Sequence, residues 1–226
     1  MAVAGIAQAA PQRIVSLNLC ADELVLRLAT PGTVQSVTWL ARDPELSNVS
    51  DLAQRVPVNQ GRAEEIVPLQ PDLVITGTYT TRMTAALLKR LDVPVLEIGV
   101  ANSVDQAIRQ IETVAAALGA RERGAQLIAD IKGRIAALPV TPVIADQPVA
   151  AIFQPNGFTI GEGSLVNDLM RRAGLRNLAV EQRITHYGLL PLESLLRAQP
   201  DFLIVNAADE HASPAMAHRI LQHPAL

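Results

Sequence analysis

Four aromatic side chains stand out as candidates for binding chemistry, because aromatic residues make up only 3% of this 226-residue chain. Trp39, Tyr79, Phe158 and Tyr187 fall in expected loops rather than in expected core strands. Tyr79 lies in the loop after an expected strand and Phe153 closes another, at the carboxyl ends where open α/β sheets place ligand sites. Aromatic side chains placed on loops favour contact with a large, partly apolar ligand. The sequence therefore favours a binding protein over an enzyme.

Arginines near the same loops are candidates for binding the charged edges of such a ligand. Arg42, Arg62, Arg82 and Arg183 occupy these positions. Guanidinium groups pair well with carboxylates and phosphates. For each one taken alone, a solvated surface position is the simpler explanation.

Catalytic motifs are scarce. The sequence contains no phosphate-binding P-loop, no His-Glu-x-x-His zinc helix and no Gly-x-Ser-x-Gly nucleophile elbow. Gly161–Gly163 precede an expected helix, but Val166 replaces the third small residue of a dinucleotide-binding loop, so the glycines are expected to shape a loop. The alternative function is a doubly wound enzyme domain using Cys20 or His186. Cys20 is more simply expected to be a small buried thiol at a strand end.

Cysteine and histidine usage argues against a free metal ion as ligand. A single cysteine excludes an intramolecular disulfide and any multi-cysteine zinc or iron–sulfur site. All histidines lie in the second half, so the first half supplies no imidazole: His186, His211, His218 and His223. We expect no catalytic residue, no metal held by side chains and no resident cofactor.

Charge and hydropathy restrict the partners. The net charge is −3 with no run of like charges, which argues against a nucleic-acid partner. No apolar run approaches the ~18–20 residues that span a bilayer. Residues Ala2–Ala10 are small and apolar and resemble the tail of a secretory signal peptide, with a remnant of cloning or of a start site as the alternative.

Alternating strands and helices are expected to position these residues. Strands are expected over 13–18, 33–38, 73–76, 95–98, 149–153 and 202–205, and helices over 22–29, 63–70, 82–91, 164–173 and 192–198. Between the two series, a helix over 103–118 is followed by one over 120–138 and a proline-containing linker. Strands separated by helices of this length predict parallel, doubly wound sheets.

An internal repeat links the two halves. Glu64–Ile75 matches Glu193–Ile204 without a gap, and each copy holds a short helix, a Gln-Pro-Asp stop and a strand. The repeat predicts two similar α/β lobes. A chance match between α/β segments is the alternative.

Pro11–Leu17, Glu64–Ile75 and the interlobe helix resemble a periplasmic solute-binding protein of the cobalamin and ferric-siderophore ABC importers, from about Pro11 to the end of the chain. The resemblance implies an α/β fold of two doubly wound, Rossmann-like lobes linked by a long rigid helix. These would be an N-terminal lobe over 11–118, an interlobe helix and linker over 119–148, and a C-terminal lobe over 149–226 without its last strand and helix. It also implies a monomer in the periplasm, exported by a signal peptide that is incomplete here.

The implied function is capture of a metal chelate (ferric siderophore, cobalamin or haem) and its delivery to an inner-membrane ABC permease. One surface glutamate per lobe would dock onto permease arginines, and Glu64 and Glu193 match those positions. The cleft loops carried over are 18–21, 39–42, 60–62, 78–79, 154–158, 186–187 and 206–209. The ligand-binding residues expected in or near these loops are Trp39, Arg42, Arg62, Tyr79, Arg82, Gln154, Phe158 and Tyr187.

Overall fold

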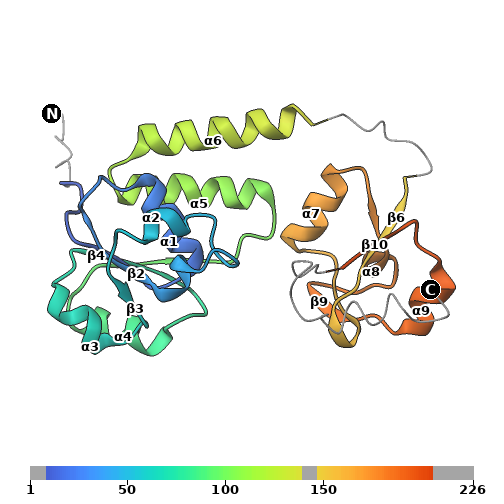
Figure 1. Ribbon diagram of the computed structural model, residues 1–226, viewed down its shortest axis with the longest axis horizontal. Coiled ribbons are helices and arrows are strands. Elements are labelled where there is room, and N and C mark those ends of the chain that lie inside the picture. Colours follow the sequence, from blue (N-terminus) through green and yellow to red (C-terminus); the bar gives the residue numbers. More distant parts are fainter. Residues whose placement is uncertain (1–8, 139–146, 206–226) are drawn as a thin grey trace, which may run out of the picture. The chain divides into compact units, whose positions relative to one another are not determined.

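The computed structural model describes residues 9–138 and 147–205 (Figure 1). These residues form two compact units. Unit 1 consists of residues 9–100 and 108–137, and unit 2 consists of residues 101–107, 138 and 147–205. In the described ranges, no helix has both the length and the apolarity needed to cross a membrane.

Unit 1 contains a five-stranded parallel sheet in the order β3-β2-β1-β4-β5. The strands are β1 (Ile14–Ser16), β2 (Val34–Thr38), β3 (Val58–Asn59), β4 (Leu73–Gly77) and β5 (Val95–Ile98). Most of α5 (Val104–Ala117) belongs to unit 1, although its first residues belong to unit 2. The other helices of unit 1 are α1 (Leu19–Leu28), η1 (Trp39–Arg42), α2 (Ser50–Ala53), α3 (Ala63–Ile66), η2 (Val67–Leu69), α4 (Arg82–Arg90) and α6 (Arg121–Ala136).

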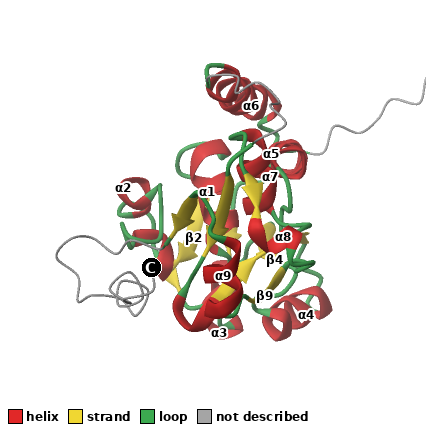
Figure 2. Cartoon of the chain, turned by 90° about the vertical axis from the view of Figure 1, so that its right-hand side faces the viewer, coloured by secondary structure: helices red, strands yellow, loops and turns green. Residues whose placement is uncertain are grey.

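Helices cover both faces of this sheet, because consecutive residues of β4 pack against different helices (Figure 2). Ile75 packs in a core cluster with residues of α1 and α5, and residues of α6 pack against that cluster. Val74 packs in a separate cluster with Ile66 of α3 and Leu88 of α4. Because successive side chains of a strand point to opposite faces, an uninterrupted apolar strand of this kind is typical of a doubly wound sheet.

Unit 2 is built in the same way around a shorter parallel sheet in the order β10-β6-β8, with a separate antiparallel pair, β7 and β9. Ala151 packs with residues of α8 and α9, whereas Ala150 packs with Met170 of α7. The elements are β6 (Val149–Ile152), η3 (Pro155–Gly157), β7 (Phe158–Ile160), α7 (Leu165–Arg172), β8 (Arg176–Asn177), α8 (Leu178–Glu181), β9 (Tyr187–Leu189), α9 (Leu192–Ala198) and β10 (Phe202–Ile204).

The two copies of the sequence repeat adopt the same local structure. Gln70 ends η2 and Gln199 ends α9, and both adopt the left-handed conformation, with φ of 45° and 44°. This conformation is uncommon for a residue with a side chain. The strand that follows then pairs in parallel with the first strand of its own unit, β4 with β1 and β10 with β6.

The aspartate of each Gln-Pro-Asp stop binds the backbone at the start of that neighbouring strand. Asp72 accepts hydrogen bonds from the N–H groups of Gln12 and Arg13, at 2.7 and 2.9 Å. Asp201 accepts one from the N–H of Val149 at 2.8 Å. The repeat therefore extends to equivalent hydrogen bonds, which a chance match between α/β segments does not explain.

Several local expectations need correction. Helix α1 begins at Leu19 rather than near Asp22, because the side chain of Asn18 accepts hydrogen bonds from the backbone N–H groups of Cys20 and Ala21. The polar loop expected after Trp39 contains η1, α2 and β3, and the loop expected after α7 contains β8, α8 and β9. The predicted lobe boundaries, and the predicted role of α6 as the interlobe connector, stay predictions.

Candidate functional site

In unit 1, the predicted ligand loops lie at one edge of the sheet. Residues 18–21 follow β1, Trp39 begins η1 directly after β2, and residues 60–62 and 78–79 follow β3 and β4. Because all these strands are parallel, their carboxyl ends share one edge, where open α/β sheets bind ligands. Trp39 is 54% exposed and Tyr79 is 77% exposed, so both rings are free to contact a ligand.

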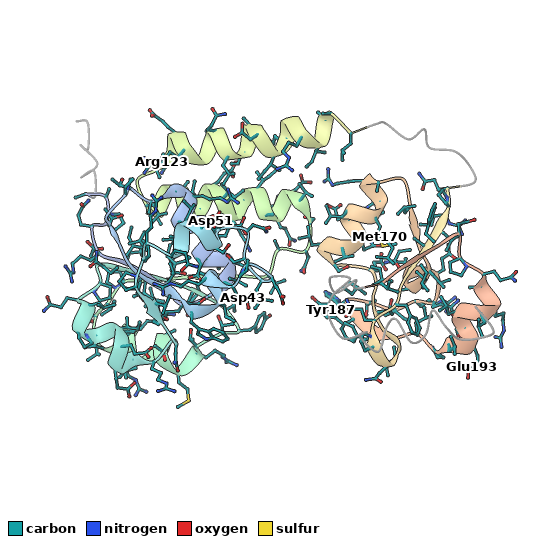
Figure 3. The ribbon with its side chains drawn as sticks, viewed as in Figure 1. Asp43, Asp51, Arg123, Met170, Tyr187 and Glu193 are labelled. Atoms are coloured by element: carbon teal, nitrogen blue, oxygen red, sulfur yellow. The ribbon has the colours of Figure 1, made fainter. Side chains whose placement is uncertain are left out.

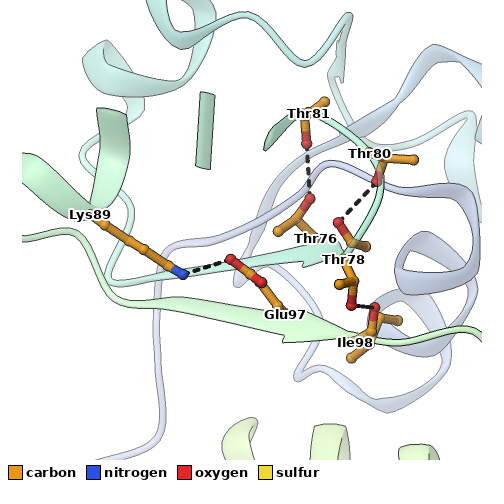
Figure 4. Close-up of polar contacts among 8 residues, drawn as sticks. Thr76, Thr78, Thr80, Thr81, Lys89, Glu97 and Ile98 are labelled. Carbon is orange, nitrogen blue, oxygen red and sulfur yellow. Dashed lines mark hydrogen bonds and ion pairs between the residues drawn. The ribbon is translucent and has the colours of Figure 1, made fainter. Parts of the chain in front are cut away.

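Threonine hydroxyls hold the loop that carries Tyr79 (Figure 4). The hydroxyls of Thr76 and Thr81 lie 2.8 Å apart, and the Thr78 hydroxyl donates to the carbonyl of Ile98 at 3.1 Å. The Asn18 amide donates to the Thr80 hydroxyl at 3.3 Å. These bonds bind the loop at both ends and leave the Tyr79 ring in solvent.

Gly61, which directly precedes Arg62, packs closely against the end of the loop that carries Tyr79. A Cβ atom on Gly61 would lie 2.6 Å from Cγ2 of Thr81, and the φ of Gly61 is +77°. Thr81 itself has a φ of 47°, which is a true outlier for a β-branched residue. The Thr84 hydroxyl donates to the carbonyl of Gly61 at 2.7 Å. The close approach to Thr81 and the bond from Thr84 therefore hold Gly61, which precedes Arg62, beside the start of α4.

Buried Asn59 anchors the same edge, and the sequence analysis missed it. Its Nδ2 donates to the carbonyl of Ser16 at 3.1 Å and to Oγ of Ser36 at 2.7 Å. Its Oδ1 accepts from the N–H of Gly61 at 3.0 Å. The only feature of the sequence at this position is an asparagine directly before Gln60 and Gly61. One asparagine is not enough to predict a buried strand end.

The predicted arginines of unit 1 differ in their surroundings. Arg42 donates to the carbonyls of Ala53 and Val56 at 3.3 and 2.8 Å, so its guanidinium holds the end of α2. Arg62 and Arg82 are exposed and form no ion pair with any described residue. A ligand role stays a prediction for all three, and Arg42 already has a structural role.

Unit 2 presents a stacked aromatic pair. The rings of Phe158 on β7 and Tyr187 on β9 have centroids 5.8 Å apart and planes inclined by 17°. They are 36% and 60% exposed. Gln154 binds this hairpin through its N–H, which donates to the carbonyl of Phe158 at 2.9 Å. Phe153, in contrast, is 3% exposed and belongs to the core, so its expected place at a ligand is wrong.

The geometry does not support a nucleophilic Cys20. The thiol is exposed, not buried as expected. Neighbouring protein atoms still remove part of the water around the sulfur, and this desolvation raises the pKa of Cys20. The charges of Glu23 and Asp22 raise it further, so the thiolate is disfavoured at neutral pH. The His186 ring packs beside Gly163: a Cβ atom on Gly163 would lie 3.3 Å from Cε1 of His186. His211, His218, His223 and loop 206–209 lie outside the described residues.

The two predicted docking glutamates have the same local setting. Glu64 lies in the first turn of α3. Glu193 lies in the first turn of α9 (Figure 3). Both are exposed, and neither forms an ion pair within residues 9–138 and 147–205. Within the same ranges, no three His, Cys, Asp or Glu residues form a metal-binding cluster.

Known proteins resemble this chain in sequence. Residues 14–226 match the family described as periplasmic binding protein. A cobalamin-binding protein of Halobacterium salinarum is 25% identical over 205 residues, which cover 88% of this chain and 54% of that protein. An uncharacterized ABC transporter substrate-binding lipoprotein of Bacillus subtilis, YvrC, is 23% identical over 203 residues, covering 86% and 63%. The chain therefore spans 54% and 63% of the length of these two relatives.

Solved structures resemble it in fold. The periplasmic haem-binding protein RhuT from Roseiflexus sp. RS-1 is 29% identical, with a TM-score of 0.67 over 86% of this chain and 76% of that one. A possible iron-binding, periplasmic solute-binding protein of Staphylococcus epidermidis has a TM-score of 0.73 at 18% identity, covering 89% and 79%. The vitamin B12 binding protein BtuF of Vibrio cholerae has a TM-score of 0.67 at 21% identity, covering 94% and 82%.

Proposed function

The chain belongs to the periplasmic binding protein family, and on that basis we propose that it is the substrate-binding component of an ABC importer, located outside the cytoplasm. Members and relatives of this family are transport binding proteins, not enzymes. The proposed cargo is a metal chelate: haem, cobalamin or a ferric siderophore. Haem-binding and cobalamin-binding proteins among its relatives support this class of ligand.

The exposed aromatic side chains carry the proposal. Trp39 and Tyr79 extend from one sheet edge of unit 1, and Phe158 and Tyr187 form a stacked pair on unit 2. Exposed aromatic rings at the sheet edge where open α/β sheets bind ligands are candidates for contact with a partly apolar ligand. Each ring that stacks on a macrocycle or a catecholate adds ~0.5–1.5 kcal/mol beyond the area it buries. Haem and catecholate siderophores present aromatic faces of this kind.

Charged groups complete the proposed site. Arg62 and Arg82 are exposed at the same edge as Tyr79 and would pair with carboxylates at the periphery of the chelate. The metal travels inside its own chelator, so the protein needs no side-chain metal cluster of its own.

Thermal unfolding in the presence of cobalamin, haemin and a panel of ferric siderophores tests the proposal. A ligand at 100 times its Kd adds ~2.7 kcal/mol to the free energy of unfolding, which corresponds to several degrees in Tm. We expect a large shift with one chelate, weakened in Tyr79→Ala and in Phe158→Ala/Tyr187→Ala. Phe202→Ala is the matched control, because Phe202 is 52% exposed but lies outside the predicted loops. A folded protein that shifts with none of these chelates contradicts the proposal.

Glu64 and Glu193 are the proposed contacts with the permease. Replacing both with alanine should leave chelate affinity intact and abolish uptake in cells, since each carboxylate is exposed and lies outside the predicted ligand loops. Wild-type uptake by the double variant, or loss of its chelate affinity, contradicts the docking assignment.

A further inference from the structure

Asp22, in the first turn of α1, is the only acidic or basic residue that is buried in the part of the chain that the structure describes. It is 0% exposed and forms no ion pair with a described residue. Burial of a carboxyl group without an opposite charge lowers stability unless hydrogen bonds compensate for the lost water. The hydrogen bonds of Asp22 therefore indicate which part of the structure it serves.

These hydrogen bonds join α1 to the end of β2. Oδ1 of Asp22 accepts from the N–H of Thr38 at 3.1 Å, and Oδ2 accepts from the Thr38 hydroxyl at 2.5 Å. The side chain of Ser16, the last residue of β1, also hydrogen-bonds the carboxyl group. Thr38 is the last residue of β2, and Trp39 begins η1 directly after it. Asp22 therefore holds the residue that immediately precedes Trp39.

The start of α1 does not depend on Asp22. Asn18 caps this helix, because its Oδ1 accepts from the N–H groups of Cys20 and Ala21 at 3.0 and 3.3 Å. A carboxyl group that caps a helix accepts from N–H groups of that helix. Both oxygens of Asp22 instead accept from Thr38. Its role therefore lies at the end of β2.

The turn that carries Trp39 is held on its far side by separate contacts. Ala41 is 0% exposed and packs in a core cluster, and Arg42 donates to two carbonyls at and after the end of α2. Asp22 supplies the side-chain contact on the near side. The Trp39 ring is 54% exposed between these two anchors. A ring whose backbone is fixed on both sides loses little conformational entropy when it stacks on a ligand.

We propose that Asp22 is a positioning residue of the ligand site: through Thr38, it sets the position of the Trp39 ring that stacks on the chelate. The inference rests on the proposed function and deepens it, because it makes the affinity for the chelate depend on a buried group that touches no ligand. A residue that acts only through Trp39 has no effect on affinity once the Trp39 ring is removed.

The fluorescence of Trp39, the single tryptophan, reports its position without any ligand. Asp22→Ala should shift the emission maximum and change the quenching by iodide, because the carboxyl group no longer holds Thr38. Asp22→Asn should restore both wild-type values. Its amide oxygen can still accept from the Thr38 N–H, and its amide nitrogen can donate to the Thr38 hydroxyl.

Thr33→Val is the matched control. Thr33 is 6% exposed and directly precedes β2, at the opposite end of the strand from Thr38. Its hydroxyl donates to the carbonyl of Thr30 at 2.7 Å. Thr33→Val should therefore lower the Tm by loss of a buried hydrogen bond, but it should leave the emission of Trp39 unchanged.

Calorimetric titration with haemin, cobalamin and the panel of ferric siderophores tests the effect on affinity. Asp22→Ala should raise the Kd for the bound chelate about three- to tenfold, the effect of losing one aromatic stacking contact. Asp22→Asn and Thr33→Val should change the Kd less than about twofold. In a Trp39→Ala background, Asp22→Ala should raise the Kd no further, because both changes remove the same contact.

The outcomes separate this inference from the function on which it rests. A folded Asp22→Ala variant with wild-type emission and Kd overturns the positioning role, and so does an equal loss of affinity with and without the Trp39 ring. If Asp22→Ala does not fold, Thr38→Val is measured in its place, because it removes the hydroxyl and keeps the N–H bond. A wild-type protein that binds none of the chelates overturns the proposed function alone if the emission still shifts, and both if it does not.

Discussion

Replacing Asp72 with alanine removes two hydrogen bonds that hold the start of β1, and the equivalent change at Asp201 removes one that holds the start of β6. The bonds to Asp72 come from the N–H groups of Gln12 and Arg13 at 2.7 and 2.9 Å, and the bond to Asp201 comes from Val149 at 2.8 Å. A hydrogen bond to a charged group contributes ~1.5–3 kcal/mol. Both carboxylates are exposed to solvent, which weakens such interactions, so we take the contribution of each bond to the free energy of unfolding as ~1 kcal/mol.

We therefore expect Asp72→Ala to lower the free energy of unfolding by ~2 kcal/mol and Asp201→Ala by ~1 kcal/mol. Urea unfolding measures both, by circular dichroism for the whole chain and by the fluorescence of Trp39, the single tryptophan, for unit 1. Asp72→Asn should fall between wild type and Asp72→Ala, because its one side-chain oxygen still accepts one bond.

Asp51→Ala is the control, since Asp51 (labelled in Figure 3) is exposed and its side chain accepts no hydrogen bond from a described residue. Surface changes of that kind stay within ~0.5 kcal/mol. If both Asp72→Ala and Asp201→Ala stay within that range, or if Asp201→Ala costs more than Asp72→Ala, the repeated aspartate does not stabilise the strand starts as argued.

Three further changes test other parts of the structure. Burial raises the pKa of Asp22 despite hydrogen bonds from Ser16 and Thr38, so the folded chain holds this proton more tightly than the unfolded chain. Its ionisation should therefore reduce stability as the pH rises from its ordinary value of 3.8 through the raised one, and Asp22→Asn should remove that decline from urea curves taken at several pH values. Gly61→Ala should lower the free energy of unfolding by ~1–3 kcal/mol, because Gly61 has a positive φ and a Cβ atom would lie too close to Thr81. The same change should weaken chelate binding. A variant as stable as wild type in thermal unfolding would contradict this. Cys20→Ser should keep full chelate affinity by titration, and the raised pKa of Cys20 should make its alkylation slow at neutral pH and faster as the pH rises.

The sequence predicted the regular elements well where hydrophobic periodicity was strong. Helix α9 and strand β5 have the expected bounds. Helix α4 is one residue shorter than expected at its end, and α7 is one residue shorter at each end. The repeat was visible because both copies need the same residues for the same turn. Gln70 and Gln199 adopt the same left-handed conformation ahead of a proline and an aspartate that binds the neighbouring strand.

Short elements and polar anchors were not predictable in this way. Strands β3 and β8 have two residues each, too few to show any periodicity. Asn59 is buried because three partners from separate segments meet its amide, and this depends on tertiary structure. Exposure of Cys20 depended on Asn18 starting α1 early, which turned an expected strand end into a helix start.

The hydrogen bonds made by polar groups at the edge of unit 1 bear on what kind of ligand the proposed site would select. The hydroxyls of Thr76, Thr78 and Thr81 and the amide of Asn59 all bind other parts of the protein. The groups left for a ligand in these loops are chiefly aromatic faces and arginines. A site of this composition recognises a ligand by its flat surface and its peripheral charge, not by a dense pattern of hydrogen bonds. Rigid loops also avoid the entropy cost of ordering on binding. Both properties fit a bulky chelate whose metal is already fully bound. They fit a small polar solute such as a sugar or an amino acid poorly, because each hydroxyl or charged end of such a solute needs its own partner in the site.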